Sequence, residues 1–173
     1  SSHNGGNDVF VAKVSTVGNG LGYCGYIGGS ENDFAYGVAV DAAGNAYVTG
    51  LTASSEATFA VAVGPDLTFN GGTWDAFVAK LSADGSGLEY CGYIGGSMDD
   101  AAADIAVEAN GNAYVAGHTE SSEATFPVTV GPDLTINGGS DAFVAKVSAG
   151  GTALDYCGYI GGSNSDDGQG IAV

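Results

Sequence analysis

The feature that most constrains this chain is an internal repeat of about 66 residues. The string YCGYIGGS occurs three times, around Cys24, Cys91 and Cys157, at spacings of 67 and 66 residues. Residues 8–73 align with residues 75–140 without a gap and are identical at 45 of 66 positions. Repeats of this length bury a continuous core by stacking, because one unit cannot cover its own apolar face. The 173 residues therefore hold about two and a half copies of one unit.

Each unit is expected to consist of four short strands separated by turns. Runs rich in Val, Ile, Tyr and Phe alternate with Gly- and Asn-containing turns, such as Asn110-Gly111-Asn112. The strands expected in the second copy are 105–108, 113–117, 141–147 and 154–160. Apolar residues occupy neighbouring positions in these runs, so both faces of the sheet should be covered. This pattern predicts an all-β fold of four-stranded antiparallel blades in a β-propeller-like array.

The sequence predicts two complete blades with a partial blade at each end of the chain. We expect residues 1–35 to supply the third and fourth strands of a blade, and residues 168–173 the first strand of a next one. Two full blades are expected between them, at 36–102 and 103–167. A closed propeller needs roughly four to eight blades, so about two and a half cannot close a ring alone. The apolar run at 170–173 continues further in the other copies, which favours a longer protein or completion by a neighbouring molecule.

Three motifs resemble a known family of repeats. They are GVAVDAAGNAYVTG at 37–50, DAFVAKLSADGSGLEYCGYIGGS at 75–97 and SSEATFPV at 121–128. Together they resemble the bacterial beta-propeller repeat of the SBBP type, over nearly the whole chain. The departures are Ala60, where the pattern has the proline that Pro127 retains, and a long segment between the second and third strands. The resemblance implies a secreted or surface-displayed propeller and no particular chemistry.

The charge of the chain excludes some functions. Twenty Asp and Glu residues stand against three lysines, which gives a formal net charge of −17. Nucleic-acid binding through phosphate contacts is excluded because the cations for it are missing. Membrane insertion as a helix is not expected either, because the sequence has no long apolar stretch.

Acidic residues follow each GGS string, and two interpretations of them stay open. Flexible Gly-rich turns with several carboxylates can supply the oxygen ligands of Ca²⁺, which would give one site per blade. Alternatively, the carboxylates cap amides of the chain itself. The candidate calcium ligands are Asp33, Asp99, Asp100, Asp166 and Asp167. Asp8, Asp75 and Asp141, which open the third strands, are interpreted as capping residues.

The repeated lysines and cysteines suggest structural roles. Lys13, Lys80 and Lys146 are the only cationic side chains apart from histidine, at one position of each copy. We expect each either to pair with an acidic residue of its own or the next blade, or to extend its ammonium group into water. Cys24, Cys91 and Cys157 are expected to be free and buried, with links between stacked chains as the alternative.

The sequence nominates no catalytic residue. It has no GxSxG, HExxH, Walker or CxxC motif, and its two histidines do not recur between copies. We therefore expect a non-catalytic structural module, extracellular or at the cell surface. It should assemble head-to-tail with copies of itself or with further repeats, by blade and strand complementation, into an array, filament or surface layer.

A carbohydrate- or surface-binding module, similar to a lectin or adhesin, is the alternative function. Its site would be formed by the long segments 51–74 and 118–140, with glycans as partners. The competing interpretation is that these segments wrap the edge of each blade, anchored by Phe59 and Phe126.

Overall fold

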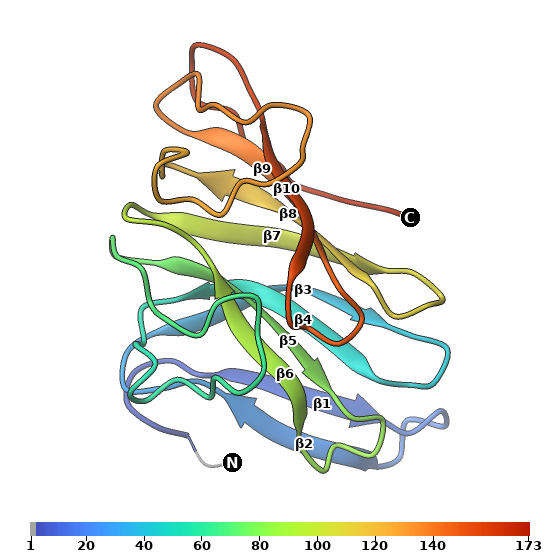
Figure 1. Cartoon of the computed structure of the whole chain (residues 1–173). Coiled ribbons are helices and arrows are strands. Elements are labelled where there is room, and N and C mark those ends of the chain that lie inside the picture. Colours follow the sequence, from blue (N-terminus) through green and yellow to red (C-terminus); the bar gives the residue numbers. More distant parts are fainter. Residues whose placement is uncertain (1–2) are drawn as a thin grey trace.

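Ten strands form three separate antiparallel sheets in the computed structural model, which describes residues 3–173 (Figure 1). The half-blade contains β1 (Val9–Val14) and β2 (Leu21–Ile27). The central blade contains β3 (Asp33–Val40), β4 (Ala46–Thr52), β5 (Asp75–Leu81) and β6 (Leu88–Ile94). The C-terminal blade contains β7 (Asp100–Val107), β8 (Ala113–Thr119), β9 (Asp141–Val147) and β10 (Leu154–Ile160). In both complete blades the strands are adjacent in sequence order, so the all-β, four-stranded prediction is confirmed.

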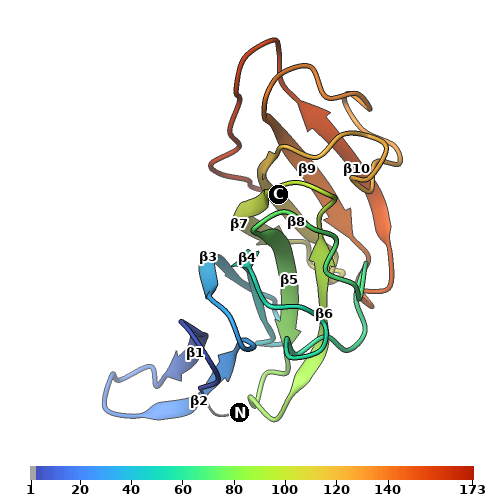
Figure 2. The same cartoon turned by 90° about the vertical axis from the view of Figure 1, so that its left-hand side faces the viewer.

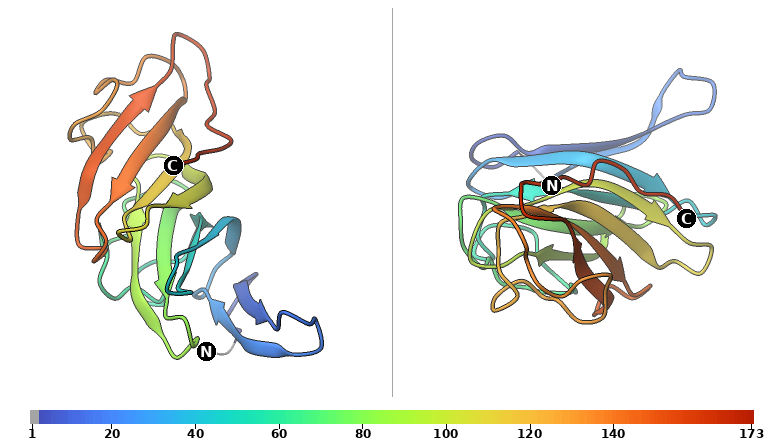
Figure 3. Two further views of the ribbon diagram at one scale, coloured as in Figure 1. Left: turned by 90° about the vertical axis from the view of Figure 1, so that its right-hand side faces the viewer. Right: turned by 90° about the horizontal axis from the view of Figure 1, so that it is seen from above.

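The three sheets stack face to face along an arc that does not close. Figure 2 and the left view of Figure 3 show the half-blade at one end, the central blade in the middle and the C-terminal blade at the other end. β7, the first strand of the C-terminal blade, contacts β3, β4 and β5 of the central blade. Each blade therefore lays its inner strands on the face of the blade before it.

The strand boundaries agree with the sequence in part. The third and fourth strands of the second copy begin and end as predicted, and the Asn110-Gly111-Asn112 turn is closed by hydrogen bonds between Glu108 and Asn112. The first strand, expected from residue 105, begins instead at Asp100, and β3 likewise begins before the expected blade boundary at 36. The reason is that Asp100 pairs with Thr119 across the sheet and so belongs to the ladder.

The C-terminal segment also differs from its expected form. Residues 168–173, expected as a first strand, form no strand in this chain. They nevertheless lie beside the C-terminal blade, because the Gly168 amide donates to Gly117 O and the Ile171 amide to Asp104 Oδ2.

The hydrophobic core lies between blades rather than inside one. Side chains of β5 alternate: Phe77 and Ala79 face the half-blade, while Ala76 and Val78 face the C-terminal blade. One core therefore joins the half-blade to the central blade, and a second joins the central blade to the C-terminal blade. This explains why the strands are apolar at successive positions.

The close approach of the inner strands requires a glycine. A Cβ on Gly37 would lie 2.9 Å from the Asp104 Cα and from the Ile105 amide nitrogen, so no larger residue fits without moving β7. Directly beside it, the pairing of β3 with β4 slips at Tyr36, and the pairing of β7 with β8 slips at Ala103. Such a bulge leaves one residue out of the ladder and redirects its side chain.

The long segments between the second and third strands cover the outer edges of the complete blades. Backbone hydrogen bonds join Val63 to Cys91 and Asp66 to Tyr93, so the first segment runs along β6. Phe59 and Phe126 are buried, and Phe59 packs against Phe77 and Tyr93. These contacts match the interpretation that the segments wrap the edge of each blade. A segment in this place protects an edge strand that would otherwise be open.

A matched pair of substitutions tests where the core lies. Phe77 is 0% exposed, whereas Phe10, at the equivalent position of the half-blade, is 69% exposed. Phe77→Ala should therefore lower the free energy of unfolding by about 3–5 kcal/mol, and Phe10→Ala by only about 0.5 kcal/mol. Urea unfolding measures both, at a concentration where copies do not associate. Equal losses for the two variants would contradict a core that lies between blades.

Candidate functional site

Buried carboxylates lie at the junction between consecutive blades. Asp100 begins β7 and is fully buried; it accepts hydrogen bonds from Thr119 Oγ1, from Ser121 Oγ at 3.0 Å and from the Gly96 amide at 2.7 Å. Asp33 repeats this arrangement with Thr52, Ser54 and Gly29. Burial raises the pKa of Asp100 to about 6 in spite of these donors, and the pKa of Asp33 in the same direction. Both carboxyls fix the GGS turn to the first strand of the next blade.

A second carboxyl meets Asp100 from the preceding blade. Asp75, the first residue of β5, is fully buried and accepts the Asn70 amide on Oδ2 at 2.7 Å. Its Oδ1 has no hydrogen-bond partner. A Cβ on Gly95 would lie 2.8 Å from Asp75 Oδ1 and 3.1 Å from Asp100 Oδ2, so only glycine leaves room for the two carboxyls.

This juxtaposition affects the ionisation of Asp75. Burial raises the pKa of Asp75 to about 7, and the negative charges of Asp100, Asp66 and Asp99 act in the same direction. The Asn70 hydrogen bond opposes the shift. A proton on the Asp75 carboxyl would remove its repulsion with these carboxylates.

The remaining calcium candidates are dispersed. Asp99 accepts the Thr73 amide across the junction, and Asp166 accepts the Gly162 amide at 2.7 Å. Asp167 contacts His118 and Gln169 instead. Within residues 3–173, no group of three or more His, Cys, Asp or Glu side chains is placed to hold a metal ion. The hydrogen bonds are those of capping carboxylates, and calcium binding stays a prediction.

The three lysines make different contacts. Lys80 Nζ lies 2.8 Å from Glu89 Oε2 and 5.2 Å from the centroid of the Tyr47 ring. Lys146 Nζ lies 3.6 Å from Glu108 Oε2 and above the Tyr114 ring. Both therefore pair within their own blade. Lys13 Nζ instead donates to the carbonyl oxygen of Ala83, in the central blade, at 3.1 Å.

The exposure of each cysteine depends on whether its face of the blade is covered by a neighbouring blade. All three are free; Cys91 and Cys157 are buried, and burial raises the pKa of each thiol to about 12. Cys24 is exposed because none of the residues that the structure describes covers this face of the half-blade.

An apolar groove runs between the half-blade and the central blade. It has a volume of about 380 Å³, and its lining includes Phe10 and Val14 of β1 and Tyr36 and Val38 of β3. In the central blade, the strand equivalent to β1 is β5, which pairs with β4. Within the described residues, β1 pairs only with β2, so its other edge is open. The groove lies where the first two strands of a complete blade would be.

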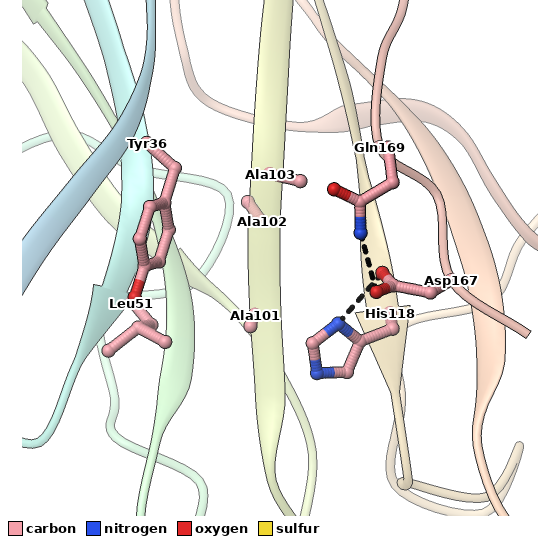
Figure 4. Close-up of a pocket in the computed structure, with 8 residues that line it drawn as sticks. All are labelled: Tyr36, Leu51, Ala101, Ala102, Ala103, His118, Asp167 and Gln169. Atoms are coloured by element: carbon pink, nitrogen blue, oxygen red, sulfur yellow. Dashed lines mark hydrogen bonds and ion pairs between the residues drawn. The ribbon is translucent and has the colours of Figure 1, made fainter. Parts of the chain in front are cut away.

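A second hollow lies over the inner strands and has several polar side chains in its lining. Its volume is about 410 Å³ (Figure 4). Tyr36 of β3 and Leu51 of β4 stand on one side, and three alanines of β7, residues 101–103, form the floor. His118 of β8 stands on the other side, with Asp167 and Gln169 of the C-terminal segment. His118 Nδ1 lies 3.1 Å from Asp167 Oδ1, and Gln169 Nε2 donates to Asp167 Oδ2.

Sequence reasoning identified this pocket only in fragments. The sequence nominates Asp167 as a calcium ligand and shows that His118 has no histidine counterpart in the first copy, but it does not nominate Tyr36 or Gln169. The sequence signal that points to this pocket is that most of its lining residues differ between the copies, whereas most other positions are identical.

The fold and its repeated junctions define a module of β-propeller repeats. Residues 25–55, from the end of β2 through β4, match the family described as SBBP, Beta-propeller repeat. The resemblance is confirmed over that range, and the second copy repeats the same segment in register at 92–122. No curated protein matches the chain. Among residues 3–173, no helix has the length and apolar character needed to cross a membrane.

The junction carboxyls generate a prediction about pH. An aspartate with an ordinary pKa of 3.8 in the unfolded chain and about 7 in the folded protein binds its proton more tightly when folded. Its contribution to stability is therefore full below pH 3.8 and is lost as the pH rises to 7. Asp75→Asn removes the buried negative charge and keeps an oxygen to accept the Asn70 amide, so it should raise the free energy of unfolding at pH 8 by at least about 1 kcal/mol. It should also flatten the decline between pH 4 and pH 7.

Urea unfolding at a series of pH values measures this effect. Glu120→Gln is the matched control, because it removes one negative charge from an exposed side chain. If Asp75→Asn is less stable than the parent protein at pH 8, the folded protein stabilises the ionised carboxylate, contrary to this prediction.

Proposed function

We propose that this chain is a structural, non-catalytic module of an extracellular or cell-surface protein, and that its blades stack head-to-tail on further repeats of the same kind. The proposal is supported by the repetition of one junction. Asp33 with Gly29, Asp100 with Gly96 and Asp166 with Gly162 make the same hydrogen bond at three successive positions. A contact that recurs with each repeat can be extended by adding units, and the rotation per unit decides between a ring and a filament.

One observation carries the proposal. Several residues of the half-blade and of β3 are exposed although their equivalents in the complete blades are buried. Phe10 is 69% exposed, against 0% for Phe77 and 1% for Phe143 at the equivalent positions. Val38 is 66% exposed, whereas its equivalent Ile105 is 4% exposed. Exposed aromatic and branched side chains in one contiguous region favour an interaction surface.

The groove between β1 and β3 suggests what covers this surface. In the central blade, the space equivalent to the groove holds β3 and β4, joined as a hairpin. The fitting occupant is therefore the inner hairpin of another repeat, from the same polypeptide or from a second copy. It would pair with the open edge of β1 and cover Val38 as β3 and β4 cover β7, which carries Ile105.

Charge is the obstacle to such stacking. A chain with a net charge of −17 brings many carboxylates together when its blades associate. Bound Ca²⁺ near the GGS turns, the expectation from the sequence, would relieve part of this repulsion. A lower melting temperature in the presence of a chelator would support bound calcium, and an unchanged one would speak against it.

A carbohydrate- or surface-binding module remains the second candidate. The segments 51–74 and 118–140 pack largely against their own blades, so they favour it less than the sequence suggested. The observation in its favour is the polar pocket around His118 and Asp167.

Self-association tests the stacking. Light scattering of the full chain should show mass increasing with concentration, and negative-stain microscopy should show arcs, rings or filaments. Phe10→Asp and Val38→Asp place charges in the apolar groove and should weaken the association at least tenfold, which corresponds to about 1.4 kcal/mol.

Val17→Asp is the control for these variants. Val17 is 76% exposed in the turn between β1 and β2, outside the groove, so its substitution should leave association unchanged. A compact monomer that persists at millimolar concentration would contradict the proposal, as would equal weakening by all three variants.

A further inference from the structure

The pocket of Figure 4 lies where the repeats differ from one another. At one position the three copies carry Tyr36, Ala103 and Gln169. At a second they carry Phe34, Ala101 and Asp167, and at a third Leu51 is replaced by His118. Two thirds of the positions are identical between the first two copies, yet only Ala102 of the pocket lining comes from a position that those two copies share. The scaffold is therefore repeated, while the pocket is unique.

The bulges explain how unique side chains are accommodated. Tyr36 and Ala103 are the residues that slip out of strand pairing, so neither contributes a paired residue to the ladder. Their side chains can change without disturbing the sheet. Small Ala103 and Ala101 leave the surface of β7 open between the Tyr36 ring and the polar side chains opposite.

The polar side of the pocket combines hydrogen-bond donors and acceptors. Asp167 accepts hydrogen bonds from Gln169 and, when the imidazole nitrogen carries a proton, from His118. Its carboxylate has lone pairs to spare, and the amide oxygen of Gln169 is a further acceptor. All three side chains are partly exposed, so they can reach a ligand.

The charge and shape of the pocket narrow the class of ligand. Anions are disfavoured because the only charge fixed in the lining is the Asp167 carboxylate and the whole chain is strongly acidic. A volume of about 410 Å³ lies within the usual range for small-molecule sites. An aromatic ring, an alanine floor and a hydrogen-bonding wall together suit a ring-shaped molecule with one apolar face and many hydroxyl groups.

We propose that this pocket binds an uncharged hexopyranose, as a free sugar or as the end of a glycan. The Tyr36 ring packs against the C–H face of the sugar, whose hydrogens carry partial positive charge toward the negative face of the ring. Asp167 and Gln169 accept from sugar hydroxyls, and His118 contributes the third polar contact. Of the segments 51–74 and 118–140, only Leu51 and His118 line the site, and Tyr36 is the one residue that it shares with the apolar groove.

Titration of the full chain with sugars tests the inference. Glucose, galactose and mannose are the neutral probes; glucose 6-phosphate and tetramethylammonium are the anionic and cationic comparisons. Two-dimensional NMR should show saturable shifts around Tyr36, His118 and Asp167 with at least one neutral hexose. The phosphate should bind at least tenfold more weakly than its parent sugar.

Variants taken from the other copies keep the fold intact. His118→Leu installs the residue of Leu51, and Asp167→Ala installs that of Ala101. Each should weaken hexose binding at least tenfold, while Glu120→Gln, outside the pocket lining, should not. His118 does not line the apolar groove, so light scattering of the same samples separates a failure of sugar binding from a failure of stacking.

Three results would overturn the inference. They are the absence of shifts with every hexose, tighter binding of tetramethylammonium than of any sugar, and hexose binding that both variants leave unchanged. The second result would assign the pocket to organic cations. The third would place the sugar on another surface of the molecule.

Discussion

The structure depends on the packing of one sheet face against the next. Neither complete blade contains a core of its own, because the buried side chains of β5 are divided between two neighbours. Packing of this kind makes each blade dependent on the blades beside it, as in other repeat proteins. It also explains why Gly37 and Gly95 stand at contacts where a Cβ would meet another blade or its carboxyl. The blades must approach each other closely at these two positions, and only glycine, which has no side chain, permits this approach.

Packing is strong enough to bury groups that prefer water. Burying a carboxyl without full hydrogen bonding costs roughly 1–3 kcal/mol or more, yet Asp75 and Asp100 meet at a junction with one oxygen unsatisfied. The apolar area buried between sheets offsets this cost. In return, the Thr, Ser and amide donors around Asp100 fix the angle at which the next blade begins. Some of the acidic side chains of the chain are therefore buried. Their effect on stability depends on pH as well as on salt concentration.

The sequence predicted the periodic part of the molecule well. The repeat length gave the number of blades, and turns such as Asn110-Gly111-Asn112 gave the hairpins, because these follow from local residue chemistry. The start of β7 at Asp100 was missed, since an acidic residue after Gly-Gly-Ser resembles a turn until its partner Thr119 is known. The pocket was missed for a similar reason. His118 and Asp167 are 49 residues apart, and only the stacking of strands brings them together.

The placement of the lysines affects how the molecule would meet proteases. The chain has no arginine, so an enzyme that cleaves after basic residues has only Lys13, Lys80 and Lys146 to attack. Such enzymes need an extended segment that can leave its surroundings. Lys80 and Lys146 lie in β5 and β9, which are paired with a strand on both sides. Only Lys13, on the open edge of β1, is accessible, and a cut there would divide β1 while leaving both complete blades intact.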